Sequence, residues 1–576
     1  MQGYHGRRLE IDLTERSWHQ QEIAEDILTN YLGGKGLAAH LLLEEAPAGV
    51  DALAPESPLI VAIGPATGSG LAPAGRHALF AKSPLTGVFG ESYSGGHVAP
   101  KIDATGYDAV TIQGAADHPV YLEVSEGAVT FHDATEFWRL DAYDAEKALE
   151  EAVAAPGAKA IVIGPAGENL VPFAVVANDR GHQCGRTGIG AVMGSKKLKG
   201  IVFHGSAERP LFDPEGVREF NRALRDRGRD DAGVKAYREL GTPMVVAMTN
   251  TAGAFPSYYW SKGTVDFWEQ ISAETLVERF QPRPRACHGC FIACRKGSKV
   301  REGRHAGLEL EGPEYETIYA FGGLCAIDDL AEIAHLNDLC DRLGMDTITA
   351  GNVAGFAIEA SRRGALDVEL DYGDVDGIAE LLRQLAKQEG PGELLGQGVR
   401  HASQELGLED LAVHVKGMEP AGYEPRALKG MGLAYAISDR GACHLRATVY
   451  KAELSGWVEP DAAEGKGELV MDFEDRHTIF DTLVFCRFYR DLIGWEELPV
   501  VVEKLTGLEM NKEQLQAVSA RIADTIREYN LREGMTPADD TLPSRLLKES
   551  LQPGGQSLTR RELDTMLEEY YELRGW

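Results

Sequence analysis

The sequence predicts an α+β chain, with a β-rich N-terminal domain followed by two mainly α-helical domains. The 576 residues are too many for a single hydrophobic core. Residues 1–208 contain short β-prone segments between glycine and proline loops. From about Phe212, apolar residues recur at the three- and four-residue intervals of helices. We place the domains at residues 1–208, 209–413 and 414–576.

The N-terminal domain is predicted to consist of two related halves. Its expected strands are Pro58–Ile63, Ala109–Gln113, Val120–Val124 and Ala160–Ile163. The segment 61–68 reads VAIGPATG and 161–167 reads IVIGPAG, and each precedes a Phe-Ala pair. This weak repeat suggests that both halves turn glycine loops towards one ligand, although a strand–turn pattern can also recur by chance.

The other two domains are predicted from helical periodicity. Expected helices are Ala331–Leu343, Ile378–Gln388, Asp475–Leu492, Asn511–Tyr529 and Arg560–Leu573. Arg283–Arg285 is expected to be a loop that leads into a cysteine cluster. No low-complexity linker separates the domains, so we expect them to pack tightly around something shared.

Composition and charge exclude some classes of protein. Hydrophobic residues make up 44% and charged residues 26%, as in ordinary globular proteins. The net charge of −31 argues against nucleic-acid binding, which needs a basic surface. No apolar leader and no run of 18 apolar residues is found. We therefore expect a cytoplasmic protein without a membrane span.

The strongest local signal is the sequence CHGCFIAC at 287–294, which spaces Cys287, Cys290 and Cys294 as C-x₂-C-x₃-C. Three thiolates at this spacing favour an iron–sulfur cluster. A zinc half-site and purely structural thiols are the alternatives. The candidates for a fourth ligand are the other five cysteines, Cys184, Cys325, Cys340, Cys443 and Cys486.

Two further segments, 341–346 and 481–486, share the pattern Asp-x-x-x-apolar-(Asp/Cys). A carboxylate suits a pterin, because the ring's amino group and adjacent N–H form a donor pair that it can accept. Cys486 ends the second copy, which could thus serve both a pterin and the cluster. Taken alone the pattern is weak, since Asp is common at helix ends.

Several stretches together resemble the tungsten-containing aldehyde:ferredoxin oxidoreductase family. They occur in the family's order, and the resemblance extends from about Tyr4 to Trp576. They are LGGKGLAAHLLLEE (32–45), GPATGSGLAPAGR with FAKSPLTG (64–87), YSGG (93–96), GRTGIGAVMGSKKLKGI (185–201), CHGCFIAC (287–294), EGPEYETI (311–318), NDLCDRLGMDTIT (337–349), DRGACHLRA (439–447) and DDTLPSRLL (539–547).

This resemblance implies a set of cofactors. Two pyranopterin dithiolenes would hold one tungsten or molybdenum, a Mg²⁺ ion would join the two pterin phosphates, and one 4Fe–4S cluster would lie beside one pterin. By motif match the cluster ligands would be Cys287, Cys290, Cys294 and Cys486. Arg76 would lie between cluster and pterin, where a fixed cation stabilises electron-rich groups.

The resemblance also implies residues that bind the pterins and their phosphates. They are Tyr93, Ser94, Gly95, Gln183, Gly185, Arg186, Asp341, Met345, Asp346, Arg440, Arg446, Asp481, Phe485 and Arg487. The sequence departs from the family's usual residues at Tyr93, at Gln183-Cys184 and at Val484-Phe485. Magnesium contacts there could still come from backbone carbonyls.

For proton chemistry the resemblance places Glu316 and His444 beside the metal, with Glu314 as a structural neighbour. A buried Glu of raised pKa or a His can act as acid or base. The implied reaction is oxidation of an aldehyde to a carboxylic acid, with electrons passing to ferredoxin or to an iron–sulfur or flavin partner subunit. A homo-oligomer or a hetero-complex is expected.

Two alternatives remain open from the sequence. One is the catalytic subunit of a low-potential complex that reduces aromatic acyl thioesters. The other is an electron-transfer subunit that keeps the cluster without pterin chemistry, although Asp341, Asp346 and Asp481 with the glycine loops argue against it.

Overall fold

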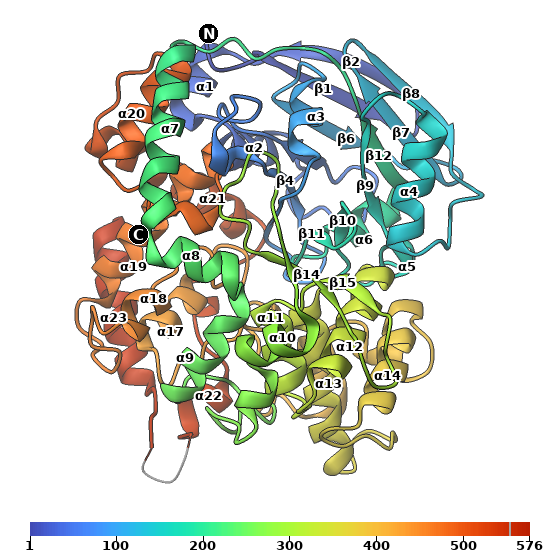
Figure 1. Ribbon diagram of the computed structural model, residues 1–576, viewed down its shortest axis with the longest axis vertical. Coiled ribbons are helices and arrows are strands. Elements are labelled where there is room, and N and C mark those ends of the chain that lie inside the picture. The colour runs from blue at the N-terminus through green and yellow to red at the C-terminus, as the bar shows by residue number, and fades with distance from the viewer. Residues whose placement is uncertain (552–554) are drawn as a thin grey trace.

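The computed structural model describes residues 1–551 and 555–576, and Figure 1 shows their arrangement. The N-terminal domain contains two six-stranded sheets. Their strands are β1 (Arg7–Asp12), β2 (Ser17–Glu22), β3 (Leu59–Ala62), β4 (His77–Lys82), β5 (Phe89–Ser94), β6 (Ala109–Gln113), β7 (Val120–Ser125), β8 (Ala128–Asp133), β9 (Lys159–Ile163), β10 (Val176–Asn178), β11 (His182–Cys184) and β12 (Leu198–Phe203). The four expected strands are confirmed, to within one residue at most ends.

The two sheets have the same topology. One has the order β2-β1-β6-β3-β4-β5 and the other β8-β7-β12-β9-β10-β11. In each sheet a single parallel pair, β1 with β6 and β7 with β12, joins an N-terminal hairpin to four antiparallel strands. The two related halves predicted from the weak sequence repeat are therefore real, and the repeat falls at β3 and β9.

Short helices connect these strands. They are α1 (Glu25–Tyr31), α2 (Gly34–Glu45), α3 (Ala99–Asp103), α4 (Ala142–Val153), α5 (Pro165–Glu168) and α6 (Ile189–Ser195). Helix α4 begins where Asp141 accepts the backbone N–H of Asp144, a capping bond that fixes its start. Each sheet thus has one helix of 12 residues before its central strand, α2 before β3 and α4 before β9.

The second region is mainly helical. Its helices are α7 (Pro214–Asp230), α8 (Ala232–Glu239), α9 (Val245–Thr251), α10 (Ala273–Phe280), α11 (Tyr315–Thr317), α12 (Leu330–Leu343), α13 (Thr347–Arg362), α14 (Val375–Lys387), α15 (Pro391–Leu395) and α16 (Val399–Leu406). The prediction of a loop at Arg283–Arg285 is wrong. It is a strand, β13, that pairs with β14 (Arg295–Lys299) and closes the cysteine segment into a hairpin. Strand β15 (Glu309–Glu311) completes this three-stranded sheet.

The third region contains α17 (Lys429–Ile437), α18 (Tyr450–Leu454), α19 (Lys466–Leu483), α20 (Glu497–Thr506), α21 (Lys512–Arg532), α22 (Ser544–Lys548) and α23 (Arg560–Arg574). The predicted helix Asp475–Leu492 is only partly correct. It begins at Lys466 and ends at Leu483, because Val484 adopts a left-handed conformation with φ of 56°. This early ending sets the position of Cys486.

Hydrophobic cores cross the boundaries between these regions. One core joins the second region to the C-terminal helices α17, α19 and α23. Another joins α2 and the first sheet to α19, α20 and α21, and α21 lies beside α2 in Figure 1. The regions thus pack tightly, as expected, while the exact domain boundaries stay a prediction. None of the helices in residues 1–551 and 555–576 combines the length and apolar character of a membrane span.

Candidate cofactor and active site

Four cysteines line one cavity of about 350 Å³. Cys287, Cys290 and Cys294 come from the β13–β14 hairpin, and Cys486 comes from the segment after α19. Arg76 lines the same cavity and donates a hydrogen bond to the Tyr93 carbonyl at 3.2 Å. Of the five candidates for a fourth ligand, Cys486 is the one that the fold brings to the other three.

The C-x₂-C-x₃-C spacing of three of these thiols, joined in one cavity by Cys486, fits the ligands of a cubane cluster. Zinc draws its ligands onto one atom, whereas a cubane cluster places them around a larger core. The remaining cysteines are buried elsewhere: Cys184, Cys325, Cys340 and Cys443.

Burial favours the protonated form of the thiols in this cavity. Burial raises the pKa of Cys287 to about 11, and it also raises the pKa values of Cys290 and Cys294. A metal must therefore displace protons to bind here. Burial lowers the pKa of Arg76, but the charges of Cys486 and Cys287 outweigh it and raise the pKa. Arg76 is a permanent cation at the cavity wall.

The two aspartate segments end their helices in the same way. Asp341 on α12 and Asp481 on α19 each lie three residues before a left-handed residue, Gly344 with φ of 76° and Val484 with φ of 56°. Glycine is the usual residue at this position, and a valine there is strained.

Matching hydrogen bonds close both endings. The Met345 N–H donates to the Cys340 carbonyl at 3.0 Å, and the Phe485 N–H donates to the Phe480 carbonyl at 2.7 Å. This is the bond by which a helix commonly ends after a left-handed residue. Met345 and Phe485 therefore occupy equivalent buried positions.

Each helix end packs on the glycine loop of one half of the N-terminal domain. A Cβ atom on Gly164 would lie 2.6 Å from the Leu343 carbonyl oxygen, and one on Gly64 would lie 2.6 Å from the Leu483 carbonyl oxygen. No side chain fits at such distances, so glycine is required in both loops.

The sixth residues of the two segments also dock in parallel. Asp346 donates its N–H to Phe173 O at 3.1 Å, and Cys486 donates its N–H to Pro73 O at 3.0 Å. The twofold repeat of the sheets thus extends to the helices that carry the aspartates.

Asp341 is held by neutral donors. Its carboxylate accepts hydrogen bonds from Gln183, from Asn337 at 2.8 Å and from Tyr143 at 3.2 Å. Burial raises the pKa of Asp341 to about 7, and Arg295 opposes that rise. This carboxyl therefore lies at the balance between its charged and neutral forms near neutral pH.

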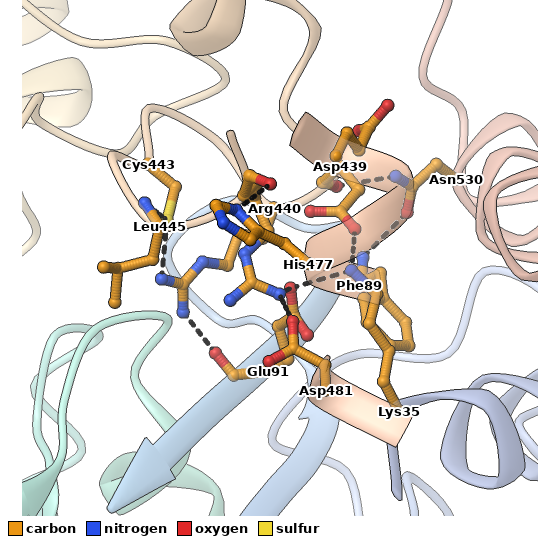
Figure 2. A network of polar contacts seen from close by, with 12 residues as sticks. Lys35, Phe89, Glu91, Asp439, Arg440, Cys443, Leu445, His477, Asp481 and Asn530 are labelled. Carbon is orange, nitrogen blue, oxygen red and sulfur yellow. Dashed lines mark hydrogen bonds and ion pairs between the residues drawn. The ribbon is translucent and has the colours of Figure 1, made fainter. Parts of the chain in front are cut away.

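Asp481 is held by arginines instead. Arg446 and Arg487 each approach its carboxylate to 2.6 Å. Arg446 also forms an ion pair with Glu91 on β5. Figure 2 shows the resulting network of buried charges, which joins the first sheet to the third region. The two equivalent aspartates thus have different electrostatic surroundings.

The same network continues on the other side of Glu91. Lys35 lies 3.1 Å from Glu91 and 2.6 Å from Asp439, and both contacts are drawn in Figure 2. Burial alone would raise the pKa of Glu91, but Arg446 and Lys35 lower it to about 2. Glu91 is therefore a fixed anion.

Of the predicted loop residues around Tyr93, Tyr93 and Ser94 end strand β5 and Gly95 follows it. The Tyr93 hydroxyl donates to Glu91 at 2.6 Å, and the Ser94 hydroxyl donates to Asn178 at 2.7 Å. Asn178 in turn donates to the Gly95 carbonyl at 3.0 Å. A Cβ atom on Gly95 would lie 2.6 Å from the Cys287 sulfur, so this loop closes directly over the cysteine cavity.

Arg186 and Asp346 meet near the first aspartate segment. Asp346 caps α13 by accepting the Ile348 and Thr349 N–H groups, and Arg186 lies 3.4 Å from it. Arg186 also donates to the Ala442 carbonyl at 2.9 Å. Gly185, the preceding residue, has its carbonyl engaged by the Ser92 hydroxyl at 2.9 Å. Asp346 therefore has a clear structural role as a helix cap.

Arg440 connects the third region to β5. It donates to the Glu91 carbonyl and, at 2.8 Å, to the Cys443 sulfur. Burial raises the pKa of Cys443, but Arg440 and Arg446 outweigh it and lower the pKa. Cys443 thus serves Arg440 and does not line the four-cysteine cavity.

Glu316 and His444 face each other. Their nearest atoms, Oε1 and Nε2, are 3.6 Å apart, and Glu316 also accepts the Gly422 N–H at 2.9 Å. Burial raises the pKa of Glu316 to about 8 and holds the pKa of His444 well below its usual value. Both groups are therefore mainly neutral at pH 7.

The neighbouring carboxylate, Glu314, has a structural position. It accepts the Thr242 hydroxyl at 2.5 Å, and that hydroxyl accepts the Tyr315 N–H at 2.9 Å. Glu314 thereby ties the start of α11 to the 3₁₀ turn at Thr242–Met244, as sequence reasoning suggested.

Several polar atoms of the predicted set are buried without a hydrogen bond. Within the part of the chain that the structure describes, they are Glu316 Oε1, His444 Nδ1, Arg186 Nε, Arg440 Nε, Arg446 Nε and Arg487 Nη1. Buried polar atoms are nearly always bonded, so this group of unbonded ones, drawn from all three regions, is consistent with a site for a polar ligand.

Sequence reasoning missed the residues that neutralise and orient this set. Glu91, Lys35 and Asp439 form the buried charge network, and Tyr143 and Asn337 orient Asp341. One signal was available, because Asn337 precedes Asp341 by one helical turn. The second available signal was Glu91 itself, a charged residue within a short β-rich segment.

The chain matches models of known domains over most of its length. Residues 8–205 match "Aldehyde ferredoxin oxidoreductase, N-terminal domain" and residues 219–576 match "Aldehyde ferredoxin oxidoreductase, domains 2 & 3". A tungsten-containing aldehyde ferredoxin oxidoreductase of Pyrococcus furiosus is 34% identical, over 100% of this chain and 97% of that protein. The corresponding protein of Pyrococcus abyssi is 33% identical with the same coverage.

A solved structure supports the fold. It is the active-site complex BamBC of benzoyl coenzyme A reductase with 1,5-dienoyl-CoA, and it matches 100% of this chain and 95% of its own chain with a TM-score of 0.87. The identity is 23%, so this likeness shows the architecture alone. With both domain models and full-length relatives in agreement, the chain is an oxidoreductase that belongs to the aldehyde ferredoxin oxidoreductase family.

Proposed function

We propose that this protein oxidises aldehydes to carboxylic acids with water as the oxygen source, and passes the electrons through one 4Fe–4S cluster to ferredoxin. A tungsten or molybdenum ion held by two pyranopterins would supply the two-electron chemistry, and the protein would supply binding and electrostatics. The observation that carries this proposal is the buried pair Glu316 and His444, because oxidation by water requires a proton to be moved at the substrate.

The residues present fit an iron–sulfur cluster. Its ligands would be the four cysteines that line one cavity, Cys287, Cys290, Cys294 and Cys486. Arg76 would stabilise its negative charge from the cavity wall. The Tyr489 hydroxyl, 3.2 Å from the Cys290 sulfur, would donate a hydrogen bond that tunes the thiolate.

The residues present also fit two pterins related by the internal repeat. Asp341 and Asp481 would each accept the donor pair of one ring from equivalent helix ends. The unbonded Nε atoms of Arg186, Arg440 and Arg446 would bind acceptor atoms of the pterins or their phosphates. Backbone carbonyls of the segment Tyr93–Gly95 would hold a Mg²⁺ ion, which would neutralise phosphate charge.

Glu316 and His444 would divide the proton transfers. Neutral His444 can donate a hydrogen bond to the carbonyl oxygen of the aldehyde and polarise it. Ionised Glu316 can accept a proton from the attacking water, and the Gly422 N–H holds its other oxygen in place. The stack of Tyr423 on His444, with ring centroids 5.8 Å apart, fixes the imidazole.

The experiment that tests this proposal compares two substrates on one anaerobic preparation. We expect aldehyde-dependent reduction of ferredoxin and no reduction of an aromatic ring in an acyl thioester. Ring reduction without aldehyde oxidation would favour the aromatic acyl reductase alternative. The absence of both activities would contradict an active-site role for Glu316 and His444.

A further inference from the structure

The segment that holds the cysteine motif carries positive charge only. Residues 279–301 contain seven Lys or Arg and no Asp or Glu, in a chain with a net charge of −31. Some of these cations face inwards. Arg295, next to Cys294, is half-buried and forms an ion pair with Glu311 at 2.7 Å. Such inner cations are matched by nearby carboxylates.

Other cations of the segment face outwards. Arg283 and Arg285 lie on β13 and are exposed. Within residues 1–551 and 555–576 neither side chain forms an ion pair, whereas exposed Arg229 on α7 pairs with Asp226 at 2.8 Å. Arg283 and Arg285 are not needed to neutralise negative charge near the cysteine cavity, so their charge is available to a partner.

A groove beside β13 concentrates this charge. Arg180, Arg283 and Arg285 line it. All three carboxylates that line the groove already have counter-ions: Asp179 pairs with Lys159 at 3.2 Å, Glu309 with Lys299 at 2.8 Å and Glu311 with Arg295 at 2.7 Å. We call Arg180, Arg283 and Arg285 the arginine surface. It has an excess of positive charge on an acidic protein.

This surface adjoins the point where electrons would leave. Arg285 lines both the groove and the four-cysteine cavity. The hairpin between β13 and the cavity, residues 283–289, is largely exposed, and Arg225 and Arg238 fix it by donating to the Gly289 and Phe291 carbonyls. A protein seated on the arginine surface would therefore lie next to the cavity.

We propose that the arginine surface docks an acidic iron–sulfur protein that accepts one electron at a time. The inference rests on the proposed function, in which each aldehyde and water yield a carboxylate, three protons and two electrons. Two oxidised carriers would each be reduced by one electron per turnover. Without local positive charge, two acidic proteins would repel each other, whereas complementary charges raise association rates by about 10–10³-fold at low salt.

The test reverses the outward charges. We expect R180E/R283E, which leaves the cysteine cavity untouched, to raise the KM for an acidic bacterial ferredoxin about tenfold or more at low ionic strength, and to flatten the salt dependence of that KM. Turnover with methyl viologen, a small cationic dye, should stay at the wild-type rate. R283E alone, which does not touch the cysteine cavity, should show a smaller change in the same direction.

A matched control separates docking from total charge. K387E/R561E makes the same change in net charge at exposed cations on α14 and α23, which lie away from β14 in Figure 1. It should leave the KM for ferredoxin unchanged. An equal rise in both double variants, or in neither, overturns the proposal, as does a change in viologen turnover or iron content that explains the loss.

The proposed function and the docking inference can fail separately. If the wild-type protein oxidises no aldehyde with either acceptor, the proposed function fails. Binding of oxidised ferredoxin is then measured directly by calorimetry at low salt. Binding that R180E/R283E weakens and K387E/R561E does not would still support the docking surface, and equal binding by all three proteins would contradict it.

Discussion

Replacing Glu316 by Gln tests the proposed acid–base chemistry through pH. Burial raises the pKa of Glu316 from 4.5 to about 8. About 1% of this carboxyl is then ionised at pH 6 and about 90% at pH 9. If the ionised form accepts a proton from water, kcat/KM for an aldehyde should rise about 90-fold between these pH values and level off above pH 9.

The assay follows viologen reduction by an aldehyde, without oxygen, from pH 6 to pH 9.5. Glu316→Gln should lose this rising limb and at least about a hundredfold in rate at its plateau. Tungsten or molybdenum, pterin and iron contents must match those of the wild type, because lost cofactor would also lower the rate. A flat wild-type profile, or a fully loaded variant with near wild-type turnover, refutes the role of Glu316.

The same substitution has an independent effect on stability. The folded-state pKa of Glu316 lies above its unfolded value, so its contribution is fully present below pH 4.5 and is lost as pH rises towards 8. The loss amounts to about 5 kcal/mol at most, from 1.36 kcal/mol per pKa unit. Glutamine stays neutral, so the variant should gain melting temperature relative to the wild type at pH 8.5 but not at pH 4.5.

Further substitutions test the remaining parts of the site. Cys486→Ala should lose the four-iron spectrum and the bound iron, whereas Cys443→Ala should keep both; the reverse result would assign the fourth ligand to Cys443. Asp341→Ala and Asp481→Ala should each lower metal and pterin content together, because a ring's donors lose their acceptor in a closed site; full occupancy in both would contradict pterin binding. His444→Ala should lower turnover at least about a hundredfold with all cofactors retained, and near wild-type turnover would leave the imidazole a packing element.

Local spacing in the sequence predicted much of the candidate site. The C-x₂-C-x₃-C motif and the two aspartate segments are short, so their geometry follows from the hairpin and helix ends that carry them. The weak repeat at 61–68 and 161–167 predicted two related halves. It is visible in the sequence because each half needs a glycine at the equivalent position, Gly64 or Gly164, where the end of a helix packs against the loop. Strands and most long helices followed from periodicity.

Other features depend on contacts across the whole fold. Glu91 and Arg446 are 355 residues apart in sequence, and no local pattern indicates that they form a buried ion pair. The end of α19 was missed because a β-branched residue such as Val484 rarely takes the left-handed conformation that stops a helix. In that conformation the Val484 side chain packs closely on Gly34, where an added Cβ atom would lie 2.8 Å from it.

The most direct test of the central claim is elemental and pterin analysis of anaerobically purified protein, combined with aldehyde turnover on the same sample. We predict one tungsten or molybdenum, two pterins and four iron atoms per chain, with turnover in proportion to the metal content. Iron without tungsten, molybdenum or pterin in an otherwise intact preparation would contradict the account and identify the chain as an electron-transfer protein.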